Sequence, residues 1–449
     1  MILLVMGQRS QRTKKLVNGV GKLSILRWLA PGLGVKRWII PILLGTTLIG
    51  IGLGIIILDI YRKAPGTWWL HIVSAASLVS IERPLRALIF ALVGLALVLW
   101  GVWGLNRAFL APYTRPGRPV LDELTGYRRK GRGPRIVAIG GGHGLATLLR
   151  GLKQYSMNIT AVVTVADDGG SSGRLRRTMG ILPPGDIRNC LAALSNDETL
   201  LTQLFQYRFA SGDEGLEGHS FGNLFITALA EITGSFEEAV SESGRVLAVN
   251  GRVLPATLHD VRLVADVVLA HAGSEVRIIG ESKIPDSHGQ INRIWLEPNN
   301  PPAYPLVIQA LLSADLIVIG PGSLFTSVLP NLLVPDIATA ITASRALKIY
   351  VCNVATQRGE TDGYSCHDHA RVLINHVGGG VFDMMLANSK TEGNLPEDAE
   401  WVLAQQADTD YGVYMADMVD DTYPWRHDSN KLARILIDLF EEKTGPLVE

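Results

Sequence analysis

Hydrophobic residues follow two different patterns along the chain. Near the N-terminus they form two long uncharged runs, at 38–58 and 87–105. From residue 135 onward, short runs of β-branched residues alternate with segments of helical period, which is typical of an α/β domain with a mostly parallel sheet. The pattern divides the chain into a basic segment 1–37, an apolar region 38–105, a basic linker 106–134 rich in Pro and Gly, and an α/β domain 135–449.

The two apolar runs have the length of transmembrane helices, because about 20 apolar residues cross the roughly 30 Å of bilayer hydrocarbon. Lysine and arginine crowd the segments before the first run and after the second, and only four lie between the runs. Positive charge is retained in the cytoplasm. The runs therefore predict a two-span hairpin anchor in the inner (cytoplasmic) membrane, with both ends in the cytoplasm. Burial of both runs in a protein core is the alternative.

Smaller features of the N-terminal part add further expectations. Gly50 and Gly54 are spaced so that two copies of the first span can pack closely, and an incidental spacing is the equal alternative. A homodimer is the expected assembly. Trp100 and Trp103 suit an interfacial aromatic belt. The basic linker suits contact with anionic lipid at the cytoplasmic face.

Composition narrows the classes of function. The formal net charge is zero, which disfavours a nucleic-acid partner. Cys190, Cys352 and Cys366 lie far apart without a C-x-x-C motif, so we expect a reducing compartment and no zinc site. The run 367–369 places two histidines around an aspartate but lacks a third ligand, so a helix start is favoured over a metal site.

The stretch that begins at residue 135 carries the first candidate site. Residues 135–139 predict a buried strand and residues 145–152 predict a helix. Glycine lets a backbone approach a phosphate, and a helix N-terminus offers free N–H groups. We therefore expect ligand contacts from Gly140, Gly141, Gly142, His143, Gly144 and Leu145. The turn matches neither the G-x-G-x-x-G fingerprint nor a P-loop, and a glycine turn without a ligand is the alternative.

A second predicted strand, 159–165, also ends in polar residues. Ligands of open parallel sheets bind at the carboxyl ends of strands. Carboxylates there suit a ribose, a polar ring or a metal, and an arginine suits phosphate. The candidate ligand-binding residues of this turn are Asp167, Asp168, Gly169, Ser171, Ser172 and Arg174. An Asx-rich turn that caps the strand is the structural alternative.

Two further polar turns precede apolar helices. Asp186 is predicted to be a helix N-cap or a ligand contact, and Arg188 and Asn189 follow it in the first turn. In the turn at 218–223, His219 is a candidate base or an ordinary hydrogen-bonding residue. Asn223 in the same turn is a candidate ligand contact.

The rest of the domain repeats the opening pattern after an interruption. Residues 245–297 alternate in polarity and predict a small β-rich insertion. A strand at 315–319 then ends in Gly-Pro-Gly-Ser, so Gly322 and Ser323 are expected to form a second anion-binding nest opposite the first. Asn353 ends a further strand and is a candidate ligand contact, and residues 432–440 predict a closing amphipathic helix.

Taken together, these motifs resemble the gluconeogenesis factor family (YvcK-like), which is related to the 2-phospho-L-lactate transferase CofD. The resemblance covers about residues 134–388 but not the membrane hairpin, and it rests on 140–145, 164–175, 183–189, 218–223, 314–323 and 350–357. His143 departs from the family, whose members often have threonine there.

The resemblance implies a Rossmann-like core (CofD/YvcK-like) that binds a nucleotide-type ligand. For the gluconeogenesis factor branch it implies binding of UDP-N-acetylglucosamine or UDP-glucose by a non-catalytic regulator of cell shape, peptidoglycan synthesis and carbon metabolism, with cell-wall synthesis proteins as partners. For the transferase branch it implies transfer of a phospholactyl or phosphoenolpyruvyl group to a deazaflavin, aided by Mg²⁺, with Asp167 and Asp168 as candidate catalytic residues. The motifs favour the first branch, and an NAD-linked oxidoreductase fits least because the fingerprint spacing fails.

Overall fold

The computed structural model describes residues 130, 131 and 133–445, apart from 196–199, 211–214, 270–273 and 405–409, together with scattered positions between 46 and 103. The chain separates into two compact units, Met1–Arg128 and Arg129–Glu449, and the second is the α/β domain. The first predicted membrane run lies mostly outside the described residues and the second is described only in short pieces, so the hairpin stays a prediction.

A search of the described residues finds no single helix that is long and apolar enough to cross a membrane. One pair of helical segments, Leu324–Leu332 and Pro335–Ala343, passes the same test of length and composition together, with a bend of 74° between them.

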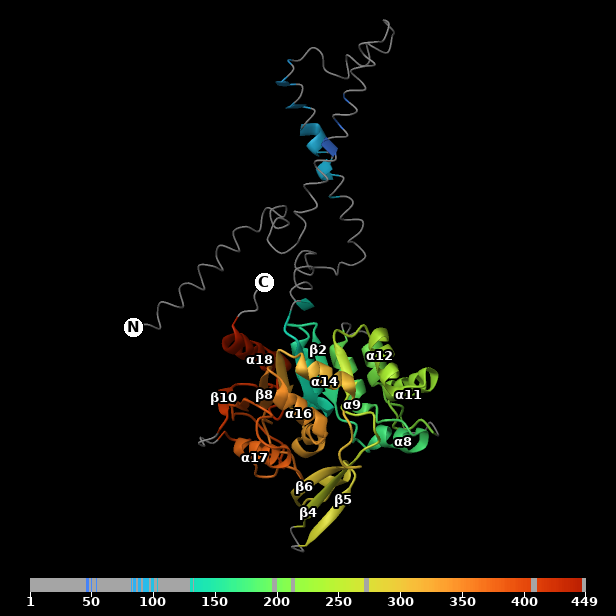
Figure 1. Ribbon diagram of the computed structural model, residues 1–449, viewed down its shortest axis with the longest axis vertical. Helices are drawn as coiled ribbons and strands as arrows, with labels where there is room; N and C mark the ends of the chain where they lie inside the picture. Colours follow the sequence, from blue (N-terminus) through green and yellow to red (C-terminus); the bar gives the residue numbers. More distant parts are fainter. Residues whose placement is uncertain are drawn as a thin grey trace, which may run out of the picture. The chain divides into compact units, whose positions relative to one another are not determined.

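A seven-stranded sheet in the order β10-β9-β8-β7-β1-β2-β3 forms the centre of the α/β domain (Figure 1). Every neighbouring pair of strands in it is parallel. The strands are β1 (Ile136–Gly140), β2 (Ile159–Val163), β3 (Arg252–Pro255), β7 (Leu316–Ile319), β8 (Leu347–Val351), β9 (Met384–Asn388) and β10 (Gly412–Ala416). β1, β2 and β7 are buried at every position, as continuous apolar strands of a covered parallel sheet should be.

The strand order reverses between β1 and β7, which is where a ligand crevice is expected. The chain moves outward from β1 to β3 and then returns to the other side of β1 to build β7–β10. Open α/β sheets bind ligands at such a reversal of strand order, beyond the carboxyl ends of the strands. The predicted Rossmann-like α/β fold is therefore confirmed, and both glycine turns leave the sheet at this point.

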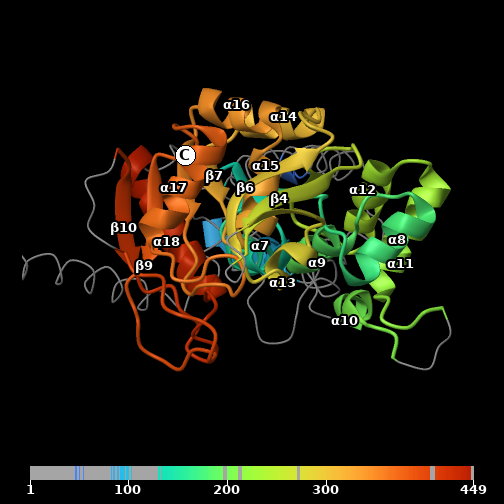
Figure 2. The same cartoon turned by 90° about the horizontal axis from the view of Figure 1, so that it is seen from below.

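Alternate residues of β1 feed two hydrophobic cores, because successive strand side chains point to opposite faces. Ile136 and Ala138 pack with α7 (Gly142–Leu152), α9 (Gly185–Leu194) and α18 (Ser429–Thr444). Val137 and Ile139 belong to the other core, which contains residues of α14 (Pro305–Leu312), α16 (Pro335–Ala343) and α17 (Cys366–Val377). Figure 2 shows α14 and α16 on the opposite side of the domain from α7 and α9.

The remaining helices are shorter or more peripheral. They are α8 (Gly170–Met179), α10 (Leu200–Gln206), α11 (Phe221–Thr233), α12 (Phe236–Val246), α13 (Lys283–Asp286), the π-helix η2 (Leu324–Val328) and α15 (Leu329–Leu332). The predicted helix start at 367–369 is confirmed, because Ser365 and Asp368 form a capping box at the beginning of α17. The predicted closing helix is also present, as α18.

The predicted β-rich insertion is confirmed, with one correction. It is a three-stranded antiparallel sheet in the order β5-β4-β6, built from β4 (Arg262–Val268), β5 (Glu275–Ile279) and β6 (Gln290–Glu297). Figure 1 shows it projecting from one end of the domain. The stretch 252–254, which the sequence assigned to the insertion, instead lies in β3 of the main sheet, because Val253 and Leu254 are buried beside β2.

Candidate functional site

The two glycine turns meet at the carboxyl ends of β1 and β7. The Gly320 N–H donates to the Ile139 carbonyl oxygen over 2.8 Å. A Cβ atom on Gly144 would lie 2.5 Å from the Pro321 carbonyl oxygen, so only glycine permits this approach. The structure therefore brings the two predicted anion nests to one place.

Both turns border one cavity of about 750 Å³, here called the main cavity. Nine of the residues predicted from the sequence line it, namely Gly141, Gly142, His143, Gly144, Asp167, Asp186, Gly322, Ser323 and Asn353. The far wall is tied together by Gln357, whose Nε2 donates to Ser323 Oγ over 2.9 Å. Asn353 at the end of β8 donates through Nδ2 to the Gln357 Oε1 over 3.4 Å.

A smaller space of about 460 Å³, here called the side cavity, adjoins the first. The predicted residues that line it are His143, Asp167, Gly169, Ser171, Ser172, Asp186, Arg188, Asn189 and Asn223. His143, Arg150, Asp167 and Asp186 border both spaces. The predicted single site is therefore a pair of adjoining cavities with Asp167 and Asp186 between them.

Four predicted residues line neither cavity. Gly140 and Leu145 are buried in the core. The Asp168 carboxylate accepts a hydrogen bond of 2.9 Å from the Ser282 N–H and so holds the end of the insertion. Arg174 donates to His219 Nε2 over 3.2 Å and to the Glu217 carbonyl oxygen over 2.7 Å. Their roles in the structure are therefore to support the neighbouring turns.

Five carboxyl groups line the main cavity, and four of them, Asp167, Asp186, Glu281 and Glu360, have a raised pKa. Burial raises the pKa of Glu281 to about 8 and that of Glu360 to about 7, and nearby Asp167 and Asp186 add to the shift at Glu281. Burial and then the charge of Asp167 raise the pKa of Asp186 to about 7. Burial also raises the pKa of Asp167, although Gly169 and Ser172 donate hydrogen bonds to it. Near neutral pH the cavity therefore holds protons on several carboxyl groups.

Asp186 lies against the first glycine turn. Its predicted N-cap role is wrong, because α9 begins at Gly185 with Pro184 as its N-cap and Asp186 is in the first turn. The carboxylate instead accepts a hydrogen bond from the Gly142 N–H. A Cβ on Gly141 would lie 2.6 Å from Asp186 Oδ2. Asp186 therefore accepts a hydrogen bond from one of the backbone N–H groups that the sequence analysis had assigned to a phosphate ligand.

The Mg²⁺ implied by the transferase resemblance can be tested against these residues. Within the described part of the chain, no group of three or more His, Cys, Asp or Glu side chains is arranged to hold a metal ion. Mg²⁺ in nucleotide sites is commonly held by one or two carboxylates and by substrate phosphates. Asp167 and Asp186 both line the main cavity. Together with the phosphates of a bound diphosphate ligand, these two carboxylates would be enough to hold Mg²⁺.

Sequence reasoning missed several cavity residues. Thr147 and Arg150 follow His143 at helical spacing on α7, and this periodicity was a detectable signal. Glu281 and Glu360 come from the insertion and from the loop before α17. Trp425, Arg426 and His427 come from the loop between β10 and α18 and line the same cavity. No local pattern marks that loop, and only the fold brings it to the site.

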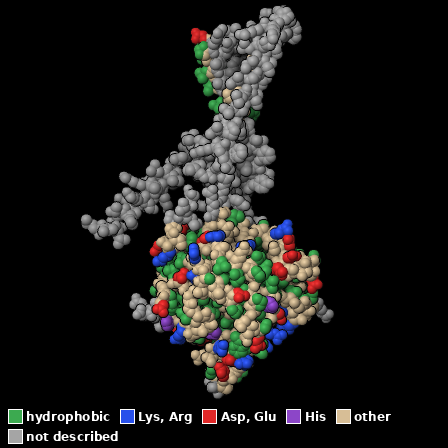
Figure 3. All heavy atoms as spheres, in the orientation of Figure 1, with side chains coloured by type: hydrophobic (Ala, Val, Ile, Leu, Met, Phe, Trp, Pro, Cys, Tyr) green, Lys and Arg blue, Asp and Glu red, His purple; other side chains and the backbone are tan. Residues whose placement is uncertain are grey.

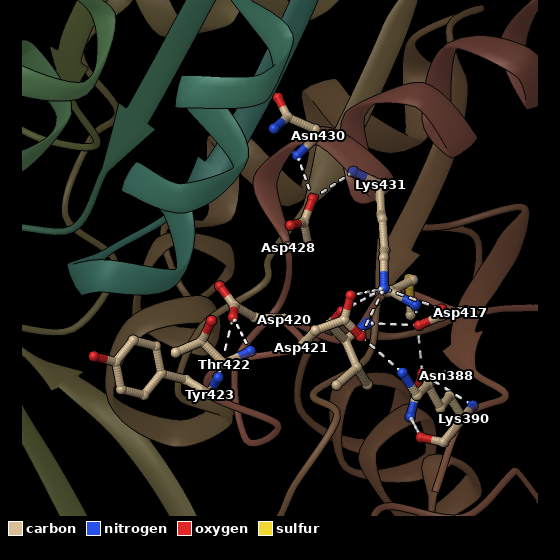
Figure 4. Close-up of polar contacts among 12 residues, drawn as sticks. Asn388, Lys390, Asp417, Asp420, Asp421, Thr422, Tyr423, Asp428, Asn430 and Lys431 are labelled. Atoms are coloured by element: carbon tan, nitrogen blue, oxygen red, sulfur yellow. Dashed lines mark hydrogen bonds and ion pairs between the residues drawn. The ribbon is translucent and has the colours of Figure 1, made fainter. Parts of the chain in front are cut away.

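The loop that carries Arg426 is fixed by a charged network (Figure 4). Lys431 Nζ donates to Asp417 Oδ2 over 3.0 Å and to the Val419 carbonyl oxygen over 2.9 Å, and it lies 3.4 Å from Asp421. Lys390 Nζ contacts the same Asp421 at 2.8 Å. Asp428 caps α18 by accepting from the N–H groups of Asn430 and Lys431. The network holds both ends of the loop.

His427 joins this loop to the sheet. Its Nε2 lies 3.1 Å from the Cys352 carbonyl oxygen, directly after β8. Burial lowers the pKa of His427 to about 4, so the ring is neutral at physiological pH and Nε2 carries the hydrogen that it donates. This contact places the preceding residue, Arg426, at the wall of the main cavity.

Comparison with known proteins identifies relatives of the domain. The family model described as 2-phospho-L-lactate transferase CofD matches residues 136–444. The gluconeogenesis factor of Bacillus subtilis is 46% identical over 326 residues, which cover 70% of this chain and 100% of that protein. The crystal structure of a UPF0052 family member from Bacillus halodurans aligns with a TM-score of 0.63 at 43% identity, covering 68% of this chain and 99% of that chain.

One relative extends the similarity into the N-terminal part. A protein of Nostoc sp. is 47% identical over 447 residues, which cover 96% of this chain and 94% of its own length. The similarity and the parallel sheet agree with the resemblance seen in the sequence motifs. The chain therefore belongs to the gluconeogenesis factor (UPF0052) family and carries a CofD domain.

Proposed function

We propose that the main cavity binds a nucleotide sugar, UDP-N-acetylglucosamine or UDP-glucose, and that the chain is a membrane-tethered, non-catalytic regulator of cell shape, peptidoglycan synthesis and carbon metabolism. The observation that carries the proposal is the meeting of two glycine turns at the strand-order reversal, beside a cavity of about 750 Å³. That size lies within the roughly 300–1,000 Å³ of small-molecule sites.

The wall residues suit the parts of such a ligand. Backbone groups of the two turns and the guanidinium groups of Arg150 and Arg426 favour the diphosphate. Asp167 and the side chain of Asn353 offer oxygen acceptors for ribose or sugar hydroxyls. Ser323 accepts its hydrogen bond from Gln357, so its own hydroxyl hydrogen is free to be donated to a phosphate oxygen.

Calorimetric titration of the purified full-length protein tests this proposal. We expect saturable binding of UDP-N-acetylglucosamine or UDP-glucose by the wild type, and weaker binding by about tenfold or more in Arg426→Ala, because a charged hydrogen bond to the diphosphate is lost. Arg434→Ala, an exposed arginine on α18, is the matched control and should bind like the wild type. Binding of a guanosine diphosphate adduct and of no UDP-sugar would refute the proposal.

A transferase is the second candidate, because several carboxyl groups in the main cavity have pKa values near neutrality, as general acids and bases require. On this proposal Asp167 and Asp186 would hold Mg²⁺ together with the diphosphate, and Mg²⁺ would neutralise charge on the transferred group. Turnover with a deazaflavin acceptor, abolished in Asp167→Asn, would support it. Absence of turnover together with tight UDP-sugar binding would exclude it.

We also propose that the chain is anchored in the inner membrane, forms a homodimer and binds a cell-wall synthesis protein. Acidic and basic side chains are interspersed over the face of the α/β domain seen in Figure 3. The formal net charge of the chain is zero, which favours a small-molecule and protein partner over nucleic acid. Crosslinking in intact cells, followed by mass spectrometry of the captured proteins, tests the partner. Recovery of ribosomal or DNA-bound proteins alone would contradict it.

A further inference from the structure

The side cavity has a charge character different from that of the main cavity. Its wall carries Arg188 and Arg208, which the main cavity does not share, and Arg150, which borders both. The carboxyl groups of Asp167 and Asp186 stand only at the partition, whereas Glu281 and Glu360 line the main cavity alone. The outer part of the side cavity is therefore cationic.

Arg188 is buried in a way that leaves a donor unused. Its exposed fraction is 7%, and its stem packs where a Cβ of Gly222 would otherwise lie. One terminal nitrogen donates to Asn189 Oδ1 over 2.8 Å, but the buried Nε has no hydrogen-bond partner. A buried charged donor without a partner is costly, so Arg188 is held in the wall of the side cavity with hydrogen-bonding capacity that the protein does not use.

The N-terminus of α8 opens into the same space. Gly169 is its N-cap and no side chain caps it, and Gly169, Gly170, Ser171 and Ser172 all line the side cavity. The first N–H groups of a helix have no partners within the helix and carry a partial positive charge. This turn therefore presents backbone donors to whatever lies beside Arg188.

A chain of hydrogen bonds orients Ser171 toward donation. Arg174 Nε can only donate, so His219 Nε2 accepts over 3.2 Å and the hydrogen of the neutral ring is on Nδ1. His219 Nδ1 lies 3.0 Å from Ser171 Oγ, and Asn223 Nδ2 donates to the same oxygen over 3.1 Å. With two bonds accepted, the Ser171 hydroxyl has its own hydrogen left to donate.

We propose that the side cavity is a phosphate site, which binds the phosphate group of a small molecule through Arg188, Arg208 and the N-terminus of α8. Asn223 supports the site through its Nδ2, which donates to Ser171 Oγ over 3.1 Å. Arg174 is a positioning residue that acts through His219 and Ser171. The proposal does not depend on which ligand occupies the main cavity.

Titration of the purified full-length protein with inorganic phosphate, followed by phosphorus NMR or calorimetry, tests the site. We expect Arg208→Met to weaken phosphate binding by about tenfold. Arg208 is exposed and its NH1 donates to the Gly218 carbonyl oxygen over 3.1 Å, so its loss is compatible with folding. Arg188→Met should weaken binding at least as much. Arg245→Met, at an exposed surface ion pair on α12, is the control and should bind normally.

Two outcomes would overturn the proposal. One is that the wild type shows no saturable phosphate binding. The other is that Arg208→Met binds phosphate as the wild type does, because phosphate held by the glycine turns of the main cavity would not sense Arg208. A repeat with saturating UDP-N-acetylglucosamine then identifies the source of the phosphate. Unchanged phosphate affinity would support a separate phosphorylated effector, and displacement would support a phosphate group of the main-cavity ligand that extends into the side cavity.

Discussion

Asp186 shows how one side chain sets the charge of the whole site. It is only partly exposed, it borders both cavities, and it accepts a hydrogen bond from the first glycine turn. Its carboxyl group lies where an approaching phosphate needs N–H donors. In its charged form Asp186 repels an anion, and in its protonated form it does not, so the protonation state of Asp186 controls access to the turn.

This position predicts a pH-dependent affinity. Burial and Asp167 raise the pKa of Asp186 to about 7, so the group loses its proton as pH rises through that value. Binding of an anionic nucleotide sugar should therefore weaken as pH rises through about 7, because binding favours the protonated form. Asp186→Asn should make the loss of affinity through about pH 7 shallower and leave the changes that Glu360 causes near 7 and Glu281 causes near 8.

Calorimetric titrations at a series of pH values measure this profile. Asp438→Asn, at an exposed position on α18, serves as the control and should keep the wild-type slope. If Asp186→Asn and the wild type lose affinity in parallel through about pH 7, the carboxyl group of Asp186 does not control the site.

At the scale of elements, two glycines of α7 allow close contacts with different partners. Gly144 faces the second turn at Pro321, whereas a Cβ on Gly151 would overlap the Ser429 carbonyl oxygen at the start of α18. Gly144→Ala and Gly151→Ala should each lower the free energy of unfolding by about 1–3 kcal/mol, as overpacking usually does. Only Gly144→Ala should also abolish ligand binding, since it pushes the two turns apart. Chemical denaturation and ligand titration at a temperature where both variants are folded separate these effects, and equal binding by both would contradict the claim that the turns act together.

The network around Lys431 predicts a remote effect on binding. Lys431 holds Asp417, Val419 and Asp421, and this loop carries Arg426 to the main cavity. Lys431→Met should weaken UDP-sugar binding by about tenfold because Arg426 loses its fixed position. Lys443→Met, at the other end of α18, should leave binding unchanged. Combining Lys431→Met with Arg426→Ala should add little to the loss from Arg426→Ala alone; a fully additive loss would show that Lys431 acts independently.

At the scale of the whole molecule, the sequence predicted the parts of the site that are local and missed the parts that are not. Buried strands followed by glycine turns were predictable from runs of β-branched residues, and β1 and β7 are found where expected. The direction in which a single side chain points could not be predicted from the sequence. Asp167 and Asp168 are adjacent and identical, but Asp167 lines the main cavity whereas Asp168 binds the Ser282 N–H. Arg426 was not predictable either, because its place depends on contacts with β8 and α18.

The relatives differ in how much of the N-terminal part they match. The Bacillus subtilis relative is covered completely by 70% of this chain, whereas the Nostoc relative is similar over 96% of it. Relatives of the domain therefore occur both with and without similarity to the N-terminal part. This difference is expected if residues 38–105 form a membrane anchor added to the α/β domain.

A two-span hairpin predicts where each part of the chain lies. The full-length protein should stay with membranes after alkaline carbonate extraction, and a variant that lacks residues 1–105 should move to the supernatant. Positive charge on both sides of the runs predicts that the α/β domain lies in the cytoplasm, so protease should digest the domain in inverted vesicles and leave it intact in sealed spheroplasts. Protection of the domain in inverted vesicles would show that it lies outside the cytoplasm, away from the nucleotide sugars that it is proposed to bind. That result would refute the membrane-tethered cytoplasmic role, and the binding of a ligand in the main cavity would still be tested separately by titration.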